Sequence, residues 1–319
     1  MRSIVIPVYR NAANVEALVD TLVALDRDFG GGTEAVFVVD GSPDDSYLRL
    51  RSLLPASGLE AQLLLLSRNF GSFSAIRAGL AAARGDSFAV MAADLQEPPE
   101  LIESFFEVLG SGEYDVVVGR RRGRGDPLPG RLLSSAFWAL YRRFVQPEVP
   151  LGGVDVFALN RRARDQIVEL REHNSSIVGL LFWIGFRRAE IPYQRRARTA
   201  GKSAWTLKKR TAYLMDSVFS FSDLPIKVLF RIGVLGLLFS LGFGALVLGA
   251  RLFGLIGVPG YAATVLLVTF FGALNCFGLG IIGGYIWRTF ENTKGRPNYI
   301  VASHVTFGRD EEGDGHGHG

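Results

Sequence analysis

The first 120 residues of the chain alternate short apolar runs with longer amphipathic segments. Apolar runs of strand length occupy residues 3–8, 35–39, 62–66, 87–93 and 114–119. Between these runs, apolar residues recur every three or four positions, as they do on one face of a helix. Strands that alternate with amphipathic helices are typical of an α/β domain with helices on both faces of a sheet. The pattern therefore predicts a doubly wound, mostly parallel sheet.

This alternation weakens after residue 119. Residues 120–126 form a basic segment, and residues 154–159 and 188–193 have the apolar pattern of two further short strands. Helical spacing returns over residues 132–145, 161–170 and 175–186. Residues 194–203 are polar, basic and rich in turn formers, so we expect a mobile loop there.

Two long uncharged runs follow, over residues 232–250 and 252–287. About 20 apolar residues span the hydrocarbon core of a bilayer, so the runs predict two transmembrane helices joined around Arg251 and residues 258–260. The alternative is a helical hairpin buried in a soluble protein. Asn275, the only amide in the second run, suits a hydrogen bond between helices better than it suits chemistry.

The charges beside these runs predict their orientation. Lys227 and Arg231 precede the first run, and Arg288, Lys294 and Arg296 follow the second, whereas the connecting loop carries only Arg251. The positive-inside rule then puts both ends of the chain in the cytoplasm.

Just before the first run, residues 205–226 mix lysine and arginine with aromatic side chains. Such a mixture suits an amphipathic helix on an anionic membrane surface, although an ordinary surface helix remains an alternative. We expect the following organisation: a cytoplasmic α/β domain over 1–204, a juxtamembrane amphipathic helix over 205–226, a two-helix transmembrane hairpin over 227–288 and a cytoplasmic tail over 289–319. The tail is acidic and rich in glycine, and we expect disorder after about Val305.

Composition narrows the class of protein. The formal charge is +4 over 319 residues, which is only mildly basic, and the mean hydropathy of +0.22 is high for a soluble enzyme. Cys276 is the single cysteine, so the chain has no internal disulfide and no zinc site built from several cysteines. Pro7 interrupts the first apolar run, so we expect no signal peptide.

Polar groups gather where the predicted strands end. Asp94 and Gln96 follow one strand, and further polar groups follow others at residues 7–9, 40–42 and 68–71. Ligands of open α/β sheets bind beyond the carboxyl ends of the strands. Oxygen donors two residues apart suit a hard cation such as Mg²⁺ or Mn²⁺ that holds a diphosphate. The plainer interpretation is that Asp94 caps the next helix.

Several common catalytic motifs are missing. No Gly-x-Gly-x-x-Gly follows the first strand, and the chain has neither a Walker lysine loop nor a Gly-x-Ser-x-Gly elbow. These absences argue against hydride transfer, P-loop hydrolysis and serine acyl hydrolysis. The basic residues 120–124 would suit nucleic acid, but phosphate recognition at a membrane explains them equally well, and we expect no nucleic-acid partner. The remaining interpretation is a donor substrate that carries phosphate and is held by a metal ion and by arginines.

These residues carry a family resemblance. The chain resembles family 2 glycosyltransferases of the GT-A fold, in the polyprenyl-phosphate group that includes dolichyl-phosphate mannose synthase-like and bactoprenol glucosyltransferase-like enzymes. The segments that carry the resemblance are residues 4–9 (Ile-Val-Ile-Pro-Val-Tyr), 39–42 (Val-Asp-Gly-Ser), 67–71 (Ser-Arg-Asn-Phe-Gly), 93–101 (Ala-Asp-Leu-Gln-Glu-Pro-Pro-Glu-Leu), Arg198-x-x-Gly201-x-Ser203 and 294–300. They cover nearly the whole chain in order.

The resemblance implies an inverting transfer of a sugar from a UDP- or GDP-linked donor to a polyprenyl phosphate. The transfer would take place at the cytoplasmic face of a membrane, here a bacterial inner membrane, with Mg²⁺ or Mn²⁺ as cofactor and a homo-oligomer as a possible assembly. A phosphate monoester has a second pKa of about 6, so the lipid phosphate is an anionic nucleophile at neutral pH and needs little help from a general base.

The resemblance also assigns residues by position. Asp94 and Gln96 would ligate the metal, and Asp94, Asp155 and Arg198 would be catalytic. Arg120, Arg198 and Ser203 would contact the phosphate of the acceptor. The residues that would bind the nucleotide sugar are Pro7, Tyr9, Asn11, Asp40, Ser42, Asn69, Gly71, Ala93 and Asp94.

The chain departs from the family pattern at three acidic positions. Asn11, Val39 and Ala92 stand where the family usually has carboxylates. These losses put the metal affinity, the identity of any base and the activity itself in question; Glu97 is a candidate replacement ligand. The alternative function is a catalytically weak nucleotide-sugar-binding or scaffold subunit in envelope-glycan assembly. A processive polysaccharide synthase would need a Gln-x-x-Arg-Trp motif and more membrane helices, which the chain lacks.

Overall fold

The computed structural model describes most of the chain. It covers residues 1–121, 139, 141–143, 146–150, 153–170, 172, 176–195, 217–219, 222, 224–253 and 260–308. Arg198 and Ser203 therefore lie outside the described residues, as do most of the helix expected over 132–145 and most of the one expected over 205–226. The domain boundary at residue 204 stays a prediction for the same reason.

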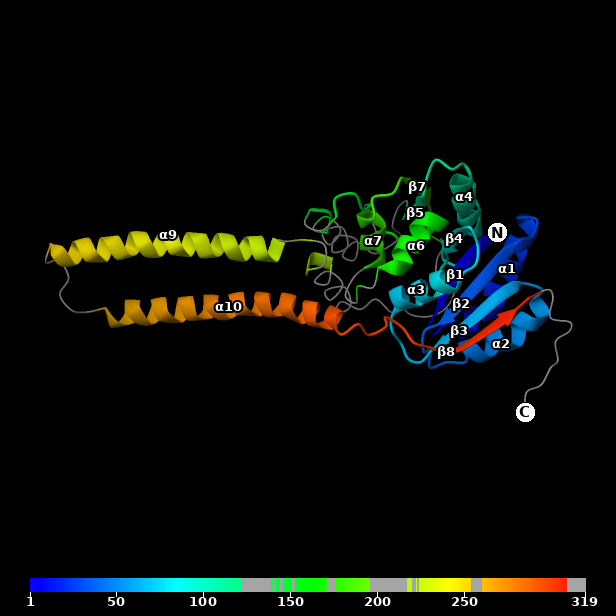
Figure 1. The fold of residues 1–319 in the computed structure, drawn as a ribbon, viewed down its shortest axis with the longest axis horizontal. Helices are drawn as coiled ribbons and strands as arrows, with labels where there is room; N and C mark the ends of the chain where they lie inside the picture. The colour runs from blue at the N-terminus through cyan, green and yellow to red at the C-terminus, as the bar shows by residue number, and fades with distance from the viewer. Residues whose placement is uncertain are drawn as a thin grey trace.

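An eight-stranded mixed sheet forms the centre of the domain, in the order β7-β5-β6-β4-β1-β2-β3-β8 (Figure 1). Its strands are β1 (Arg2–Val8), β2 (Thr33–Val39), β3 (Glu60–Leu66), β4 (Ser87–Val90), β5 (Val116–Arg121), β6 (Phe157–Asn160), β7 (Arg188–Tyr193) and β8 (Val301–Phe307). Four of the seven strand pairings are parallel, and β6 and β8 make the antiparallel ones. The expectation of a mostly parallel α/β sheet is confirmed.

Helices cover both faces of this sheet. They are η1 (Ala12–Asn14), α1 (Val15–Asp28), α2 (Ser46–Ser57), α3 (Ser72–Ala82), α4 (Pro99–Gly110), α6 (Arg161–Glu169) and α7 (Ile177–Trp183). The apolar faces of α1, α2 and α4 pack with side chains such as Ile4 and Phe37 on one face of the sheet. On the other face, α3, α6 and α7 pack with side chains such as Val5 and Val36. Helices on both faces explain why every residue of β2 is buried.

Helix α3 lies unusually close to the sheet. A Cβ atom added to Gly79 would lie 2.3 Å from Cγ1 of Val5 and 3.0 Å from Cγ2 of Val38. Only glycine at position 79 therefore allows α3 to lie this close to β1 and β2. The helix begins where the loop after β3 meets the end of β2.

The C-terminal tail returns to the domain and adds an edge strand. Strand β8 pairs antiparallel with β3, from Ala61 opposite Phe307 to Leu66 opposite Val301. The expected disorder after about Val305 is therefore wrong as far as Phe307, because main-chain hydrogen bonds to β3 order this segment. Residues 309–319 lie outside the described residues.

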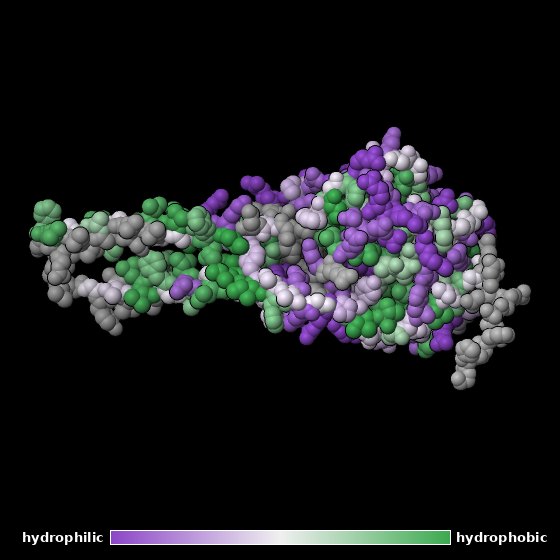
Figure 2. All heavy atoms as spheres, viewed as in Figure 1, coloured by the Kyte–Doolittle hydropathy of each residue, from purple (hydrophilic) through white to green (hydrophobic). Residues whose placement is uncertain are grey.

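Two long helices, α9 (Leu224–Leu252) and α10 (Tyr261–Thr293), project from the domain side by side (Figure 1). Where the two helices are coloured in Figure 2, most of their surface is apolar, whereas polar side chains are much more frequent on the domain. Leu246 is 72% exposed and Leu252 78% exposed, which is unfavourable in water. Glycines lie where the helices meet: Gly278 faces Leu229 across the contact.

By length and composition, one segment of the described residues, Phe270–Thr293 in α10, could cross a membrane. Its mean hydropathy is 1.4, and only 6% of its apolar stretch is buried inside the protein. No second such segment is found among the described residues, so the two transmembrane helices expected from the sequence are not both confirmed.

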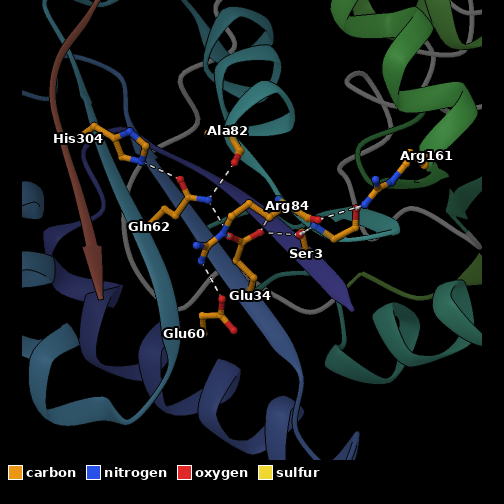
Figure 3. Close-up of polar contacts among 9 residues, drawn as sticks. Ser3, Glu34, Glu60, Gln62, Ala82, Arg84, Arg161 and His304 are labelled. Atoms are coloured by element: carbon orange, nitrogen blue, oxygen red, sulfur yellow. Dashed lines mark hydrogen bonds and ion pairs between the residues drawn. The ribbon is translucent and has the colours of Figure 1, made fainter. Parts of the chain in front are cut away.

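A network around Glu34 connects the strands at the edge of the sheet where β1 and β2 begin (Figure 3). The Glu34 side chain is fully buried, and its carboxylate accepts hydrogen bonds from Ser3 Oγ at 2.6 Å, Gln62 Nε2 at 2.6 Å, and Arg84 N and Nε at 2.8 Å each. Gln62 in turn contacts His304 of β8 at 2.7 Å. Burial alone would raise the pKa of Glu34, but these hydrogen bonds outweigh it and hold the pKa below its usual range.

We expect Glu34→Ala to destabilise the protein by about 2–3 kcal/mol, because it leaves several buried donors without an acceptor. Thermal unfolding of the full-length protein in detergent measures the change. Glu60→Ala is the matched control: Glu60 pairs with the same Arg84, but it is 39% exposed, so its loss should cost about 1 kcal/mol or less. Equal effects of the two substitutions would contradict this account of the network.

The same network predicts a dependence on pH. The folded pKa of Glu34 lies below the unfolded value of about 4.3, so the stability that it contributes is fully present above that value. This contribution is lost as the pH falls through the lower folded pKa. The difference in stability between wild type and Glu34→Ala should therefore shrink only in acid.

Candidate active site

The register of the sheet brings several strand ends to one edge. Val8, the last residue of β1, lies opposite Val39, the last residue of β2, and β4 runs parallel beside β1. Strand β6 runs the other way and begins at Phe157, opposite Val90 at the end of β4. The residues just after β1, β2, β3, β4, β5 and β7, and those just before β6, therefore lie along one edge, which we call the carboxyl edge.

Asp44 ties the loop after β1 to the loop after β2. Its Oδ1 accepts hydrogen bonds from Ser42 Oγ at 2.6 Å and Ser46 Oγ at 2.7 Å, and its Oδ2 accepts one from Ala12 N at 3.0 Å. Ser42 Oγ also accepts a hydrogen bond from Arg10 N at 2.8 Å. Tyr9, Asn11 and Ser42, all expected at the nucleotide, are thus held in one connected pair of loops.

Asp40 holds the loop after β3. Its carboxylate accepts hydrogen bonds from Phe70 N at 2.7 Å and Gly71 N at 2.9 Å, and its carbonyl oxygen accepts one from the Asn69 side chain at 3.2 Å. Asp40 is 2% exposed; burial raises its pKa, and the two backbone hydrogen bonds oppose the rise. The sequence indicated Asp40 as a nucleotide contact, and the structure shows that it also shapes the loop that carries Asn69 and Gly71.

The segment after β4 turns sharply and presents Asp94. Leu95 adopts the left-handed conformation with φ of 53°, and Gln96 N donates to Asp94 Oδ1 at 3.4 Å. The Asp94 side chain is 14% exposed and the neighbouring Ala93 is buried. Helix α4 begins only at Pro99, with Pro98 as its N-cap and no side-chain cap. Asp94 is therefore not the cap of that helix, which was its plainer interpretation.

Glu97 is the most deeply buried carboxylate of this segment, at 1% exposed. Within the described part of the chain, neither of its oxygens accepts a hydrogen bond from another residue. Burial raises the pKa of Glu97 to about 7; Arg195 opposes the rise, and Asp155 and Asp94 add to it. Burying a charged carboxylate whose oxygens accept no hydrogen bond costs free energy. A cation bound next to Glu97 would lower that cost.

Asp155 lies just before β6 and is held by two residues from neighbouring strands. Arg121, at the end of β5, forms an ion pair with Asp155, and Tyr193 at the end of β7 donates a hydrogen bond to Asp155 Oδ2 at 3.3 Å. Burial raises the pKa of Tyr193, and the negative charges of Asp155 and Glu97 raise it further. Tyr193 therefore stays protonated and acts as a hydrogen-bond donor.

Arg195 follows β7 by two residues and reaches back to the segment after β4. Its Nε lies 3.3 Å from Glu97 Oε1, and its Nη2 lies 4.0 Å from Asp94 Oδ2. Three carboxylates and two guanidinium groups from four different segments thus meet at the carboxyl edge: Asp94, Glu97, Asp155, Arg121 and Arg195.

Of the residues expected from the sequence, Asp94, Gln96 and Asp155 lie in or beside this group. Pro7, Tyr9, Asn11, Asp40, Ser42, Asn69, Gly71 and Ala93 lie on or after β1 to β4, toward the same edge. Arg120 instead points to Glu190, with Nε 3.2 Å from its Oε2, and is 46% exposed. The adjacent Arg121 faces Asp155, because neighbouring strand residues point to opposite faces.

Sequence reasoning missed Arg121, Tyr193 and Arg195, and it named Glu97 only as a candidate ligand. Side chains alternate between the two faces of a strand, so the sequences of β5 and β7 each indicated which of their own residues share a face. The pairing of Arg121 with Tyr193 in the sheet, however, joins residues that are far apart in the chain.

A divalent cation would find few protein ligands here. Among the described residues, no group of three or more histidine, cysteine, aspartate or glutamate side chains has the geometry to hold a metal. Mg²⁺ is often bound by one or two carboxylates and completed by water and substrate phosphates. Asp94, with Gln96 beside it and the open acceptors of Glu97 close by, fits such a site.

Comparison with known proteins places the chain in a family. The model of the glycosyl transferase family 2 matches residues 3–168. CsbB of Bacillus subtilis (strain 168) is 34% identical over 299 residues, which cover 94% of this chain and 90% of that protein.

Two further relatives carry more specific names. The undecaprenyl-phosphate 4-deoxy-4-formamido-L-arabinose transferase of Sodalis glossinidius is 32% identical and covers 94% of this chain and 92% of that protein. The prophage bactoprenol glucosyl transferase homolog of Escherichia coli (strain K12) is 29% identical and covers 94% of this chain and 97% of that protein. With a matched domain over half of the chain, a GT-A-like α/β fold and relatives similar along nearly their full length, the chain belongs to glycosyl transferase family 2 and is a glycosyltransferase.

Proposed function

We propose that the protein transfers a sugar, with inversion, from a UDP- or GDP-linked donor to a polyprenyl phosphate at the cytoplasmic face of a bacterial inner membrane. The product is a polyprenyl-phosphate monosaccharide. Two of the relatives described above are named for undecaprenyl-phosphate or bactoprenol transfer. The observation that carries the proposal is the group of charged residues at the carboxyl edge, on a domain attached to an apolar hairpin.

The charges of this group suit the transfer of a sugar between phosphates. The lipid phosphate is already an anion, so the enzyme has to align its attack and stabilise the charge on the departing diphosphate. Arg121 and Arg195 supply positive charge, and Asp155 holds Arg121 in place. Tyr193 keeps its proton and orients Asp155. Arg198 and Ser203 complete the acceptor phosphate site in this proposal, whereas Arg120 pairs with Glu190 and is not part of it.

Mg²⁺ or Mn²⁺ serves as cofactor in this proposal, held by Asp94 and Gln96. A divalent cation stabilises the negative charge of a leaving diphosphate. The loops held by Asp40 and Asp44 bind the nucleotide, with Tyr9, Asn11 and Asn69 toward the nucleoside. Ala92 and Val39 leave fewer carboxylates than the family pattern has, so most of the remaining metal ligands come from the donor itself.

Helices α9 and α10 both cross the membrane in this proposal and leave the two ends of the chain in the cytoplasm. Helix α9 has 29 residues and α10 has 33, and either is long enough to span a bilayer core. Lys227 and Arg231 lie near the start of α9, and Arg288 and Lys294 lie near the end of α10, where they face anionic lipid headgroups. The site thereby stays close to a lipid that cannot leave the bilayer.

We expect Asp94→Asn to lower the formation of lipid-linked sugar by about a hundredfold or more, because it removes the carboxylate that binds the metal and donor. The assay gives the full-length protein radiolabelled UDP- and GDP-sugars, undecaprenyl phosphate and Mn²⁺, and counts the lipid extract. Asp86→Asn is the control, since Asp86 is exposed just before β4, at the opposite end of that strand. Its activity should match wild type.

Two results would count against the proposal. Asp94→Asn with wild-type activity would show that the site is elsewhere. Wild-type protein that binds UDP or GDP in calorimetry but gives no lipid-linked product with any donor would favour the alternative, a nucleotide-sugar-binding subunit without transfer activity.

The two-pass topology predicts a pattern of labelling in cells. With Cys276→Ser as background, Val258→Cys in the connecting loop should react with a membrane-impermeant maleimide added to spheroplasts. Ala302→Cys, exposed on β8, should react only after the membrane is opened. Labelling of Ala302→Cys in sealed spheroplasts would contradict the proposed orientation.

A further inference from the structure

The guanidinium of Arg195 lies between two carboxylates of the segment after β4. Its Nε is 3.3 Å from Glu97 Oε1 and its Nη2 is 4.0 Å from Asp94 Oδ2. Glu97 is almost fully buried and Asp94 is only 14% exposed. Two carboxylates in so little water repel each other, so a cation beside them is needed for both to stay charged.

These contacts balance charge without good hydrogen bonds. Within the described part of the chain, neither oxygen of Glu97 accepts a hydrogen bond from another residue, and Nε of Arg195 donates none. By contrast, the same donor type in Arg84 makes a 2.8 Å hydrogen bond to the buried Glu34. Arg195 therefore offsets part of the negative charge of the pair but leaves the lone pairs of Glu97 available to another cation.

The other arginine of the site is already committed elsewhere. Arg121 pairs with Asp155, and the Asp155 carboxylate also accepts a hydrogen bond from Tyr193. Arg195 is thus the cation that faces both Asp94 and Glu97 in the described part of the chain. Its side chain is 29% exposed, whereas Tyr193, two residues earlier, is buried at the end of β7. The backbone is therefore anchored close by, while part of the Arg195 side chain is exposed to solvent.

We propose that Arg195 is a resident counter-cation of Asp94 and Glu97, which a divalent metal displaces when the nucleotide donor binds. This inference rests on the proposed function, because it takes Asp94 as a metal ligand. The metal and the guanidinium compete for the same negative charge, so the metal binds weakly alone. The diphosphate of the donor accepts the displaced guanidinium, since arginine pairs well with phosphate oxygens. Metal and nucleotide then bind cooperatively.

Ala92, which stands where the family usually has a carboxylate, fits this exchange of cations. A second acidic side chain there would add negative charge next to Asp94 and favour metal binding without nucleotide. With Ala92, the guanidinium of Arg195 faces two carboxylates, Asp94 and Glu97, rather than three. Binding of the metal then depends on the charge that the diphosphate adds.

The test is the affinity of the full-length protein for Mn²⁺, measured from the free Mn²⁺ signal in electron paramagnetic resonance with no nucleotide, with UDP and with GDP. We expect Arg195→Gln to bind Mn²⁺ alone about tenfold more tightly than wild type, because a positive charge about 4 Å from the metal ligands has been removed. The enhancement of Mn²⁺ binding by nucleotide should be smaller in the variant than in wild type. Arg195→Met should behave in the same way.

Two controls separate this effect from others. Arg51→Gln removes one positive charge from an exposed position on α2 and should leave Mn²⁺ affinity within about twofold of wild type. Arg195→Lys keeps the charge and should remain closer to wild type than Arg195→Gln.

The outcomes also separate the inference from the proposed function. Unchanged or weaker Mn²⁺ binding in both Arg195→Gln and Arg195→Met, with binding still lost in Asp94→Asn, would overturn the role of Arg195 alone. Mn²⁺ binding that survives Asp94→Asn, or wild-type protein that binds no Mn²⁺ with either nucleotide, would overturn the metal site of the proposed function and the inference with it.

Discussion

A buried carboxylate must find either hydrogen-bond donors or a cation, and the two edges of this sheet meet that requirement differently. At the edge where the strands begin, Glu34 accepts hydrogen bonds from Ser3, Gln62 and Arg84, and this network links β1, β2 and β3 to the residues before β4. At the carboxyl edge, Glu97 lies against Arg195 without such hydrogen bonds. The first arrangement satisfies the buried carboxylate with hydrogen bonds, whereas the second leaves the oxygens of Glu97 with open lone pairs, where we propose that a metal ion binds.

The rest of the site depends on this difference. The parallel strands fix the positions of the loops, and Asp40 and Asp44 fasten those loops to each other through backbone hydrogen bonds. The loops that we propose bind the nucleotide thus lie at the same edge as Asp94 and Glu97, which both face the guanidinium of Arg195. Rigid surroundings make the electrostatic effect of a bound metal or diphosphate larger, because the protein cannot relax around it.

Much of the fold, and part of the site, could be predicted from the sequence for a physical reason. Hydrophobic periodicity is local, so the strands and helices of the first 120 residues were predictable, and the end of a parallel strand is where ligands bind, which singled out Asp94 and Gln96. The neighbours of Asp155 were not predictable, because they depend on which strands pair and in which register. Whether Arg120 or Arg121 faces Asp155 is decided by the pairing of β5 with β6 and β7.

The strand β8 was missed for a different reason. Its half-buried residues, Ser303, Val305 and Phe307, alternate with exposed ones over only a few positions, after a long apolar hairpin and before an acidic, glycine-rich end. The period-two pattern was nevertheless present.

The return of the tail to β3 has a mechanical consequence. The chain leaves the domain before α9 and comes back to it after α10, where Ile300 accepts a hydrogen bond from Ser67 and Ser303 contacts Tyr47 of α2. The hairpin is thus joined to the domain by two chain segments, of which the second ends in a sheet. A single flexible connection would let the domain swivel relative to the hairpin, whereas two connections, one of them ending in a strand of the sheet, restrict that motion. With both helices in the membrane, as proposed above, the two connections would limit how far the carboxyl edge can tilt away from the headgroups, so the fold itself would set the distance between the site and the bilayer.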